Sequence, residues 1–120
     1  MSYASPIVLK NAAAANENFV RLNADANKVN YMLATSTLQA PVFLVVGHQL
    51  TTAQDGSDRH LVKIARTVVG TDLKPRTCVI SCTIAVPRNT ISRVDVDNGI
   101  AELKEFLTTA NVDALLRGEL

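Results

Sequence analysis

Aromatic residues are rare in this chain, and long hydrophobic runs are absent. Of its 120 residues only 4% are aromatic and none is tryptophan, so a core must be built from valine, leucine, isoleucine and alanine. No apolar stretch approaches the roughly 20 residues that a membrane-spanning helix requires. The N-terminus also lacks the basic and then apolar order of a secretory signal peptide. These absences predict a folded protein that is made in the cytosol and does not enter a membrane.

Sequence motifs for catalysis and cofactor binding are missing as well. The chain contains no P-loop, no G-x-G-x-x-G and no G-x-S-x-G nucleophile motif. Its carboxylates concentrate toward the C-terminus, where a solvent-facing helix surface explains them more simply than a general acid/base pair. We therefore expect no enzyme, no cofactor and no small-molecule substrate.

Cysteine is limited to Cys78 and Cys82. On one extended strand their Cα atoms would lie about 13 Å apart, whereas a disulfide tolerates less than about 7 Å. We therefore predict buried, reduced thiols; the alternative is a bond from Cys78 to another subunit.

His48 and His60 share even positions with both cysteines and suggest a zinc site, but the spacing matches no closed motif. Core packing without a metal is the prediction.

The second half of the chain changes from strand to helical periodicity. From position 77 to 87, apolar residues at even positions alternate with small or hydroxylic residues at odd positions, as in an antiparallel strand with one covered face. Apolar residues then recur with helical spacing at Val96, Ile100, Leu103 and Leu107. The pattern predicts an α+β fold in which C-terminal helices cover one face of a sheet and leave the other face open.

Strand-like segments precede this region. They lie at 6–10, 18–22, 29–34, 41–51, 59–69 and 77–87, and the first two suggest a hairpin. We expect a single domain over 1–120, with a hairpin and loop at 1–28, the sheet at 29–87 and helices at 90–120. Asp95 or Asp97 is the expected cap of the first helix and Asn111 that of the second, with Gly118 as a C′ glycine.

Charge is unevenly distributed although the net charge is only +1. Residues 59–93 carry a net charge of +6, and residues 94–120 carry −4. Basic strands and acidic helices would give the molecule one side that suits a polyanion. The alternative is ordinary scatter of surface charge.

Polar residues at odd positions would share the open face of the sheet. Cations there suit phosphates, while amide and hydroxyl groups suit base edges and the 2′-hydroxyl of RNA. The alternative is a polar, solvent-facing surface without a ligand. The candidates are Gln49, Arg59, Lys63, Ser81 and Thr83.

Several local strings resemble the coat protein of small single-stranded RNA bacteriophages of the levivirus type. They are TTAQ at 51–54, RHLVKI at 59–64, CTIAVP at 82–87, ELKEFL at 102–107 and NVDALLRGE at 111–119. The resemblance implies an N-terminal β-hairpin, a five-stranded antiparallel sheet and two C-terminal helices. It also implies an interlocked homodimer with a ten-stranded sheet, assembled in the bacterial cytoplasm into an icosahedral virion around genomic RNA.

The same resemblance implies roles for individual residues. In the family a genomic RNA hairpin docks on the sheet and represses translation of the replicase. The matching RNA-binding positions are Arg59, Leu61, Lys63, Val45, Gly47, Gln49, Val79, Ser81 and Thr83. Val79 stands where relatives stack a base on tyrosine, and Val45 and Gly47 stand where Thr and Ser form an adenine pocket. Specific hairpin recognition is therefore an open question, whereas general contact with the genome is expected.

Two further sets of residues follow from the resemblance. The helix residues Val96, Ile100, Leu103, Phe106 and Leu107 are expected at the dimer interface. A loop that changes conformation at five-fold and quasi-six-fold axes is expected at Gly70, Thr71, Asp72, Leu73, Lys74, Pro75 and Arg76. The competing hypothesis is a cellular dimeric RNA- or ligand-binding module of similar architecture.

Overall fold

Six strands and two helices follow one another along the chain in a computed structural model that describes residues 5–52, 56–88 and 91–118. The α+β class is as predicted, and each predicted strand corresponds to an observed one. The elements are β1 (Ile7–Lys10), β2 (Asn16–Ala24), β3 (Lys28–Leu33), β4 (Val42–Gln49), β5 (Ser57–Val69), β6 (Pro75–Pro87), α1 (Arg93–Phe106) and α2 (Thr109–Leu116). Neither helix is long and apolar enough to cross a membrane.

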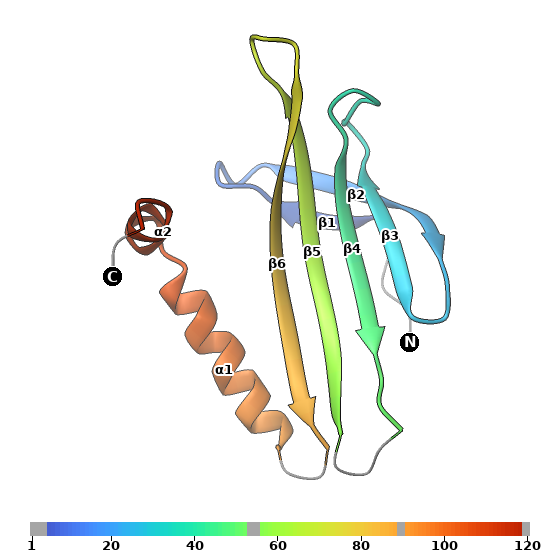
Figure 1. Ribbon diagram of the computed structural model, residues 1–120, viewed down its shortest axis with the longest axis vertical. Helices are drawn as coiled ribbons and strands as arrows, with labels where there is room; N and C mark the ends of the chain where they lie inside the picture. The colour runs from blue at the N-terminus through green and yellow to red at the C-terminus, as the bar shows by residue number, and fades with distance from the viewer. Residues whose placement is uncertain (1–4, 53–55, 89–90, 119–120) are drawn as a thin grey trace.

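The strands form one antiparallel sheet in the sequential order β1 to β6. β1 and β2 form the expected N-terminal hairpin, and because β2 also pairs with β3, the hairpin belongs to one six-stranded sheet, where the resemblance implied a five-stranded one. Figure 1 shows that the sheet curls, so that β1 and β2 run across the long strands β4 to β6. One edge of the sheet is β1 and the other is β6.

The core lies on the concave side of this curl. Tyr31, Leu44 and Ile64 are successive partners across β3, β4 and β5, so their side chains share one face. Phe19 from β2 and Leu33 from β3 join them, and Phe19 and Tyr31 are almost completely buried. Aliphatic residues thus pack around two aromatic rings, while the sequence itself suggested an aliphatic core.

Each helix begins at a hydroxyl side chain. The Ser92 side chain accepts a hydrogen bond from the backbone N–H of Asp95, and the Asp95 carboxylate accepts one from the backbone N–H of Ser92, which completes a capping box. Thr108 caps α2 in the same way through the N–H of Asn111. The predicted caps at Asp95 or Asp97 and at Asn111 were therefore wrong, whereas Gly118 does adopt the positive φ of a C′ glycine.

The helices do not cover the sheet of their own chain. Neither α1 nor α2 contains a buried residue, and Figure 1 shows α1 running beside the edge strand β6. On the face expected to be covered, Ile80 of β6 remains 69% exposed. The predicted cover is thus wrong within one chain. Burial of the thiols is wrong for the same reason, since Cys78 is exposed and Cys82 partly exposed, both of them free.

Candidate nucleic-acid interface

The residues predicted to bind RNA lie together on one face of β4, β5 and β6. Residues directly opposite each other in an antiparallel ladder share a face. Across β4 and β5 the pairs are Gln49 with Arg59, Gly47 with Leu61, and Val45 with Lys63. Across β5 and β6 they are Leu61 with Thr83, Lys63 with Ser81, and Ala65 with Val79. All nine predicted positions are therefore on the surface opposite the core, which we call the odd face.

Accessibility differs among these nine residues. Arg59, Gln49, Val79, Ser81 and Thr83 are exposed, whereas Lys63, Leu61 and Gly47 are partly exposed. Val45 is only 8% exposed. Its place in the middle of the sheet, between β3 and β5, explains this burial. Val45 therefore supports the packing of the sheet and presents little surface to a ligand.

The cations of the odd face have no carboxylate partner among the residues that the structure describes. The ion pairs in the described part of the chain join Arg66 to Glu17, Arg76 to Asp72, Arg88 to Asp58 and Arg93 to Asp97. Arg59 and Lys63 take part in none of them. Their charges are consequently available to phosphate groups.

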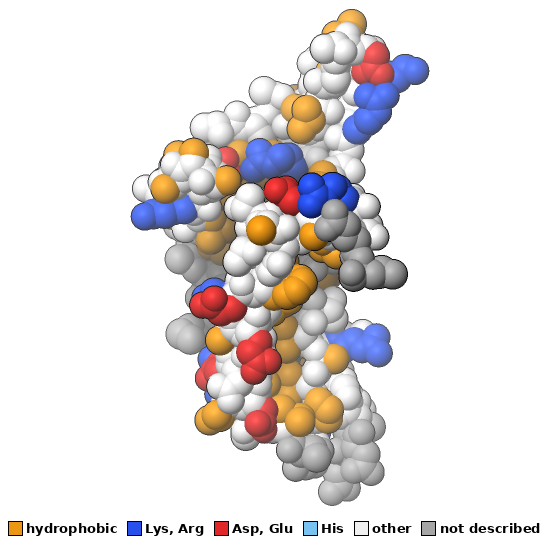
Figure 2. All heavy atoms as spheres, turned by 90° about the vertical axis from the view of Figure 1, so that its left-hand side faces the viewer, with side chains coloured by type: hydrophobic (Ala, Val, Ile, Leu, Met, Phe, Trp, Pro, Cys, Tyr) orange, Lys and Arg blue, Asp and Glu red, His pale blue; other side chains and the backbone are white. Residues whose placement is uncertain are grey.

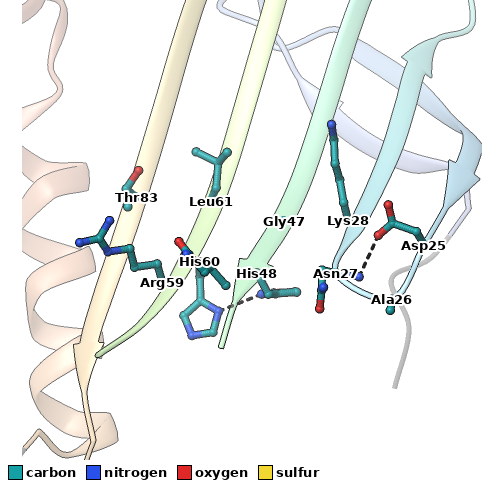
Figure 3. A pocket seen from close by; sticks show the side chains of 11 residues that line it. Asp25, Ala26, Asn27, Lys28, Gly47, His48, Arg59, His60, Leu61 and Thr83 are labelled. Atoms are coloured by element: carbon teal, nitrogen blue, oxygen red, sulfur yellow. Dashed lines mark hydrogen bonds between the residues drawn. The ribbon is translucent and has the colours of Figure 1, made fainter. Parts of the chain in front are cut away.

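A hollow of about 650 Å³ opens at the end of the odd face. Gly47, Gln49, Arg59, Leu61 and Thr83 contribute to its lining, as does the turn between β2 and β3. Figure 3 shows Lys28, Leu61, Thr83 and Arg59 around this region. Five predicted residues thus surround one concave site.

Lys28 is a cation of this site that the sequence interpretation missed. It lines the hollow and stands opposite Gly47 as the first residue of β3. The sequence predicts a hairpin and loop at 1–28 and a strand only from residue 29, so Lys28 is not among its binding candidates. The signal was present nonetheless, because Lys28 continues the odd–even alternation of β3.

The predicted dimer residues all lie in α1 or at its C-cap, and three of them face the groove between α1 and β6. Val96, Ile100 and Leu103 line a hollow of about 430 Å³ between α1 and the second half of β6. Figure 2 shows hydrophobic side chains gathered along the groove next to α1. Phe106 and Leu107 are 56% and 51% exposed, and Leu107 follows the last turn of α1 as its C-cap.

The loop predicted at residues 70–76 is shorter than expected. Pro75 and Arg76 already belong to β6, where they pair with Val69 and Val68. An Arg76–Asp72 ion pair of 2.8 Å closes the turn. The hydrogen bond from Arg76 lowers the pKa of Asp72, and a backbone hydrogen bond from Lys74 adds to this effect. Leu73, and not Gly70, adopts the positive φ of 61°.

No group of three or more potential metal ligands occurs among the described residues. The zinc hypothesis for His48, His60, Cys78 and Cys82 therefore has no support as a four-ligand site. The two histidines do meet across β4 and β5. Cys82 lies opposite Val62, and Cys78 lies further along β6, opposite Arg66.

Comparisons with known proteins point in one direction. The family model described as the coat protein of phage phiCb5 matches residues 4–89. No curated protein matches the chain in sequence. Among solved structures, the virus-like particle of Beihai levi-like virus 21 aligns at 12% identity and a TM-score of 0.73 over 99% of this chain and 98% of that one.

Two further virus-like particles have the same fold. The chain of bacteriophage AVE019 aligns at 8% identity and a TM-score of 0.79, covering 95% of this chain and 94% of that one. The chain of bacteriophage ESE020 aligns at 14% identity and a TM-score of 0.74, covering 100% and 99%. At these identities the structural matches establish a shared fold, and the family model adds the relationship in sequence.

Proposed function

The chain belongs to the coat-protein family of phage phiCb5, and on this basis we propose that dimers of it assemble into an icosahedral shell around a single-stranded RNA genome. As a coat protein of the levivirus type it is a structural protein and not an enzyme. We place the assembled protein in the virion, after synthesis and assembly in the cytoplasm of a bacterial host. A family of phage coat proteins gives no support to the alternative of a cellular binding module.

The odd face is the proposed RNA surface. The observation that carries this assignment is the presence, on the face opposite the core, of two cations that have no ion-pair partner among the described residues. Arg59 and Lys63 stand on β5 with Leu61 between them, and neither has an ion-pair partner among the described residues. Lys28 adds a third cation at the hollow. Together they form a basic surface for the phosphates of the genome.

The spacing of the cations favours contacts along an RNA strand. Lys63 follows Arg59 by four positions on an extended strand, which places their Cα atoms about 13 Å apart. Such a separation suits different phosphates better than one shared phosphate. Val79 offers no ring on which a base can stack, so we propose binding that tolerates many sequences. Translational repression would require in addition that Gln49, Ser81 and Thr83 read the base edges of one hairpin.

The proposed dimer joins two copies along β6. In the described part of the chain no other strand pairs with the outer side of this 13-residue strand, and free backbone groups of this kind pair readily with a second strand. Joining two sheets of six strands would produce one sheet of twelve, rather than the ten that the resemblance implied. Val96, Ile100, Leu103, Phe106 and Leu107 would then pack on the partner's sheet, whose apolar face lacks cover.

Replacing both cations of β5 tests the RNA surface. We expect the Arg59→Ala, Lys63→Ala double variant to bind RNA with a slope of log K against log salt that is about 1 to 2 units smaller, because two phosphate contacts no longer release counterions. Filter binding of a single-stranded RNA at several salt concentrations measures the slope. Particle assembly, followed by electron microscopy, should persist because neither residue lies in the proposed dimer interface.

The matched control is Lys10→Ala with Lys104→Ala, which removes two exposed cations outside β4 to β6. This control should leave the slope unchanged. An unchanged slope in the Arg59→Ala, Lys63→Ala variant would show that the odd face is not the RNA surface.

A further inference from the structure

Two histidines meet at the end of β4 and β5 and have no part in the proposed RNA contacts. His48 and His60 are direct partners in the ladder. Their Nδ1 atoms lie 2.8 Å apart, and the rings meet edge to face at an interplanar angle of 73°. Figure 3 shows the hydrogen bond that joins them. We propose that this pair is a binding site for one divalent copper or nickel ion per chain.

The separation of the two nitrogens selects the kind of metal. Imidazole nitrogens lie about 2.0–2.1 Å from a bound ion such as zinc. Two nitrogens 2.8 Å apart then subtend about 85° at the ion if similar bond lengths apply. Adjacent ligands of a square-planar or tetragonal site are separated by about 90°, and this is the geometry of divalent copper and nickel. A tetrahedral zinc ion would need the nitrogens about 3.3 Å apart.

The metal would displace the shared proton and lie about 1.5 Å to one side of the line between the two nitrogens, so each ring must turn to aim its Nδ1 lone pair at the ion. In the metal-free pair one Nδ1 donates a hydrogen bond and the other accepts it. When a metal binds, the donating ring carries its proton on Nε2 instead, so both Nδ1 atoms offer lone pairs and no proton is lost or gained overall.

There is room for water molecules to complete the coordination shell. Both histidines are partly exposed. His60 lines the 650 Å³ hollow at the end of the odd face. This access matters because no third His, Cys, Asp or Glu joins the pair among the described residues.

The charged groups around the histidine pair include both a carboxylate, which attracts a metal cation, and several cations, which repel it. Asp58 lies two residues before His60 and interacts with it electrostatically. The Asp58 carboxylate accepts a hydrogen bond from the backbone N–H of Thr51. Arg88 pairs with Asp58. Lys28 and Arg59 line the hollow at the end of the odd face, and Arg93 lines a second hollow together with His60. The surroundings therefore add little to the attraction of the two imidazoles.

Binding to the purified 120-residue chain tests the site directly. The variant Cys78→Ser, Cys82→Ser serves as the parent, because thiols also bind copper. Titration calorimetry with copper(II) at pH 7.5 should give one ion per chain and tighter binding than nickel(II). The chain contains only two histidines, so electron paramagnetic resonance of bound copper should show two equivalent imidazole nitrogens.

Single replacements identify the ligands. His48→Gln and His60→Gln, each introduced into the parent, should weaken copper binding at least tenfold and leave at most one imidazole nitrogen in the spectrum. Gln49→Ala, which alters a neighbour on the lining of the same hollow, should bind copper like the parent. Circular dichroism verifies that each variant is folded. The proposal is overturned if the parent shows no saturable binding, if its spectrum lacks two imidazole nitrogens, or if folded histidine variants retain its affinity.

Discussion

At the scale of single residues, we expect each cation of the odd face to contribute separately to RNA binding. Lys28 adds such a cation on β3. We expect Lys28→Ala to reduce the slope of log K against log salt by somewhat less than one unit, because one phosphate contact is lost. The same filter-binding series measures it. Lys10→Ala, in an exposed residue of β1, is the matched control and should have no effect. Equal slopes for both variants would place the RNA path away from the hollow.

Residue positions on the odd face could be predicted from the sequence because side chains alternate strictly along a strand. An error of two residues at a strand end leaves this alternation intact, so Arg59, Lys63 and Ser81 were assigned to the correct face. Burial and pairing were beyond prediction because they depend on neighbours across the sheet. Val45 is buried between two strands, and His48 meets His60 only through the β4–β5 register.

At the scale of one element, the start of α1 depends on a single hydroxyl group. Ser92→Ala removes the cap of the helix and should lower the free energy of unfolding by about 1 kcal/mol. Urea unfolding followed by circular dichroism measures the loss. Asn98→Ala, within the exposed part of α1, should cause no comparable loss. A cap variant as stable as the parent would show that α1 forms without its capping box.

The same cap should make α1 sensitive to acid. Hydrogen bonds from Ser92 lower the pKa of Asp95 below its ordinary value of 3.8. A carboxylate whose pKa is lower in the folded state stabilises that state above its unfolded pKa, and this contribution disappears as the pH falls through the folded value. Helix content should therefore fall below about pH 4, and less steeply in Ser92→Ala than in the parent.

The turn between β5 and β6 is the element that we expect to vary most between copies in a particle. The ladder fixes both of its ends, whereas Leu73 at its tip is 83% exposed and adopts a positive φ. Residues 70–74 can consequently change conformation without moving either strand. Electron cryomicroscopy of particles should show larger differences there than in any other loop. Identical turns in copies from inequivalent positions would contradict the expectation.

The predicted bounds of an element agree best with the structure where they depend only on the alternation of side chains within that element. The strand predicted at 59–69 corresponds to Ser57–Val69, and that at 77–87 to Pro75–Pro87. The cap of α1 was misplaced because Ser92, Asp95 and Asp97 are all suitable cap residues, and only the backbone geometry distinguishes them. The union of the hairpin with the main sheet depends on pairing between β2 and β3, which periodicity does not reveal.

For the whole molecule, the uncovered surfaces predict that no stable monomer exists. α1 has no buried residue, and both its apolar side and the face of β6 beside it need a partner. Leu103→Asp should abolish soluble protein, because it would bury an unpaired charge in the dimer. Glu102→Gln, at the adjacent exposed position, is the control. A folded monomer of the parent at micromolar concentration in analytical ultracentrifugation would contradict the prediction.

The main error for the whole molecule was the prediction that the C-terminal helices cover the sheet of their own chain. Amphipathic spacing at Val96, Ile100 and Leu103 shows that a helix has an apolar side, but it does not show which chain provides the complementary surface. The structure of one chain leaves that side largely exposed. The sequence pattern was therefore wrong about cover of the sheet within a single chain, and cover by a partner chain stays a prediction.

The two edges of the sheet are unequal, and this limits how far strands can add to one another. β6 offers 13 residues, whereas the opposite edge, β1, has only four and lies across the long strands where the sheet curls. A protein with two long, flat edges would polymerise into fibres. In the proposed dimer the sheet extends at the β6 edge, so strand addition stops after two copies. Further growth of the assembly must use other surfaces, which is the condition for a closed shell instead of a filament.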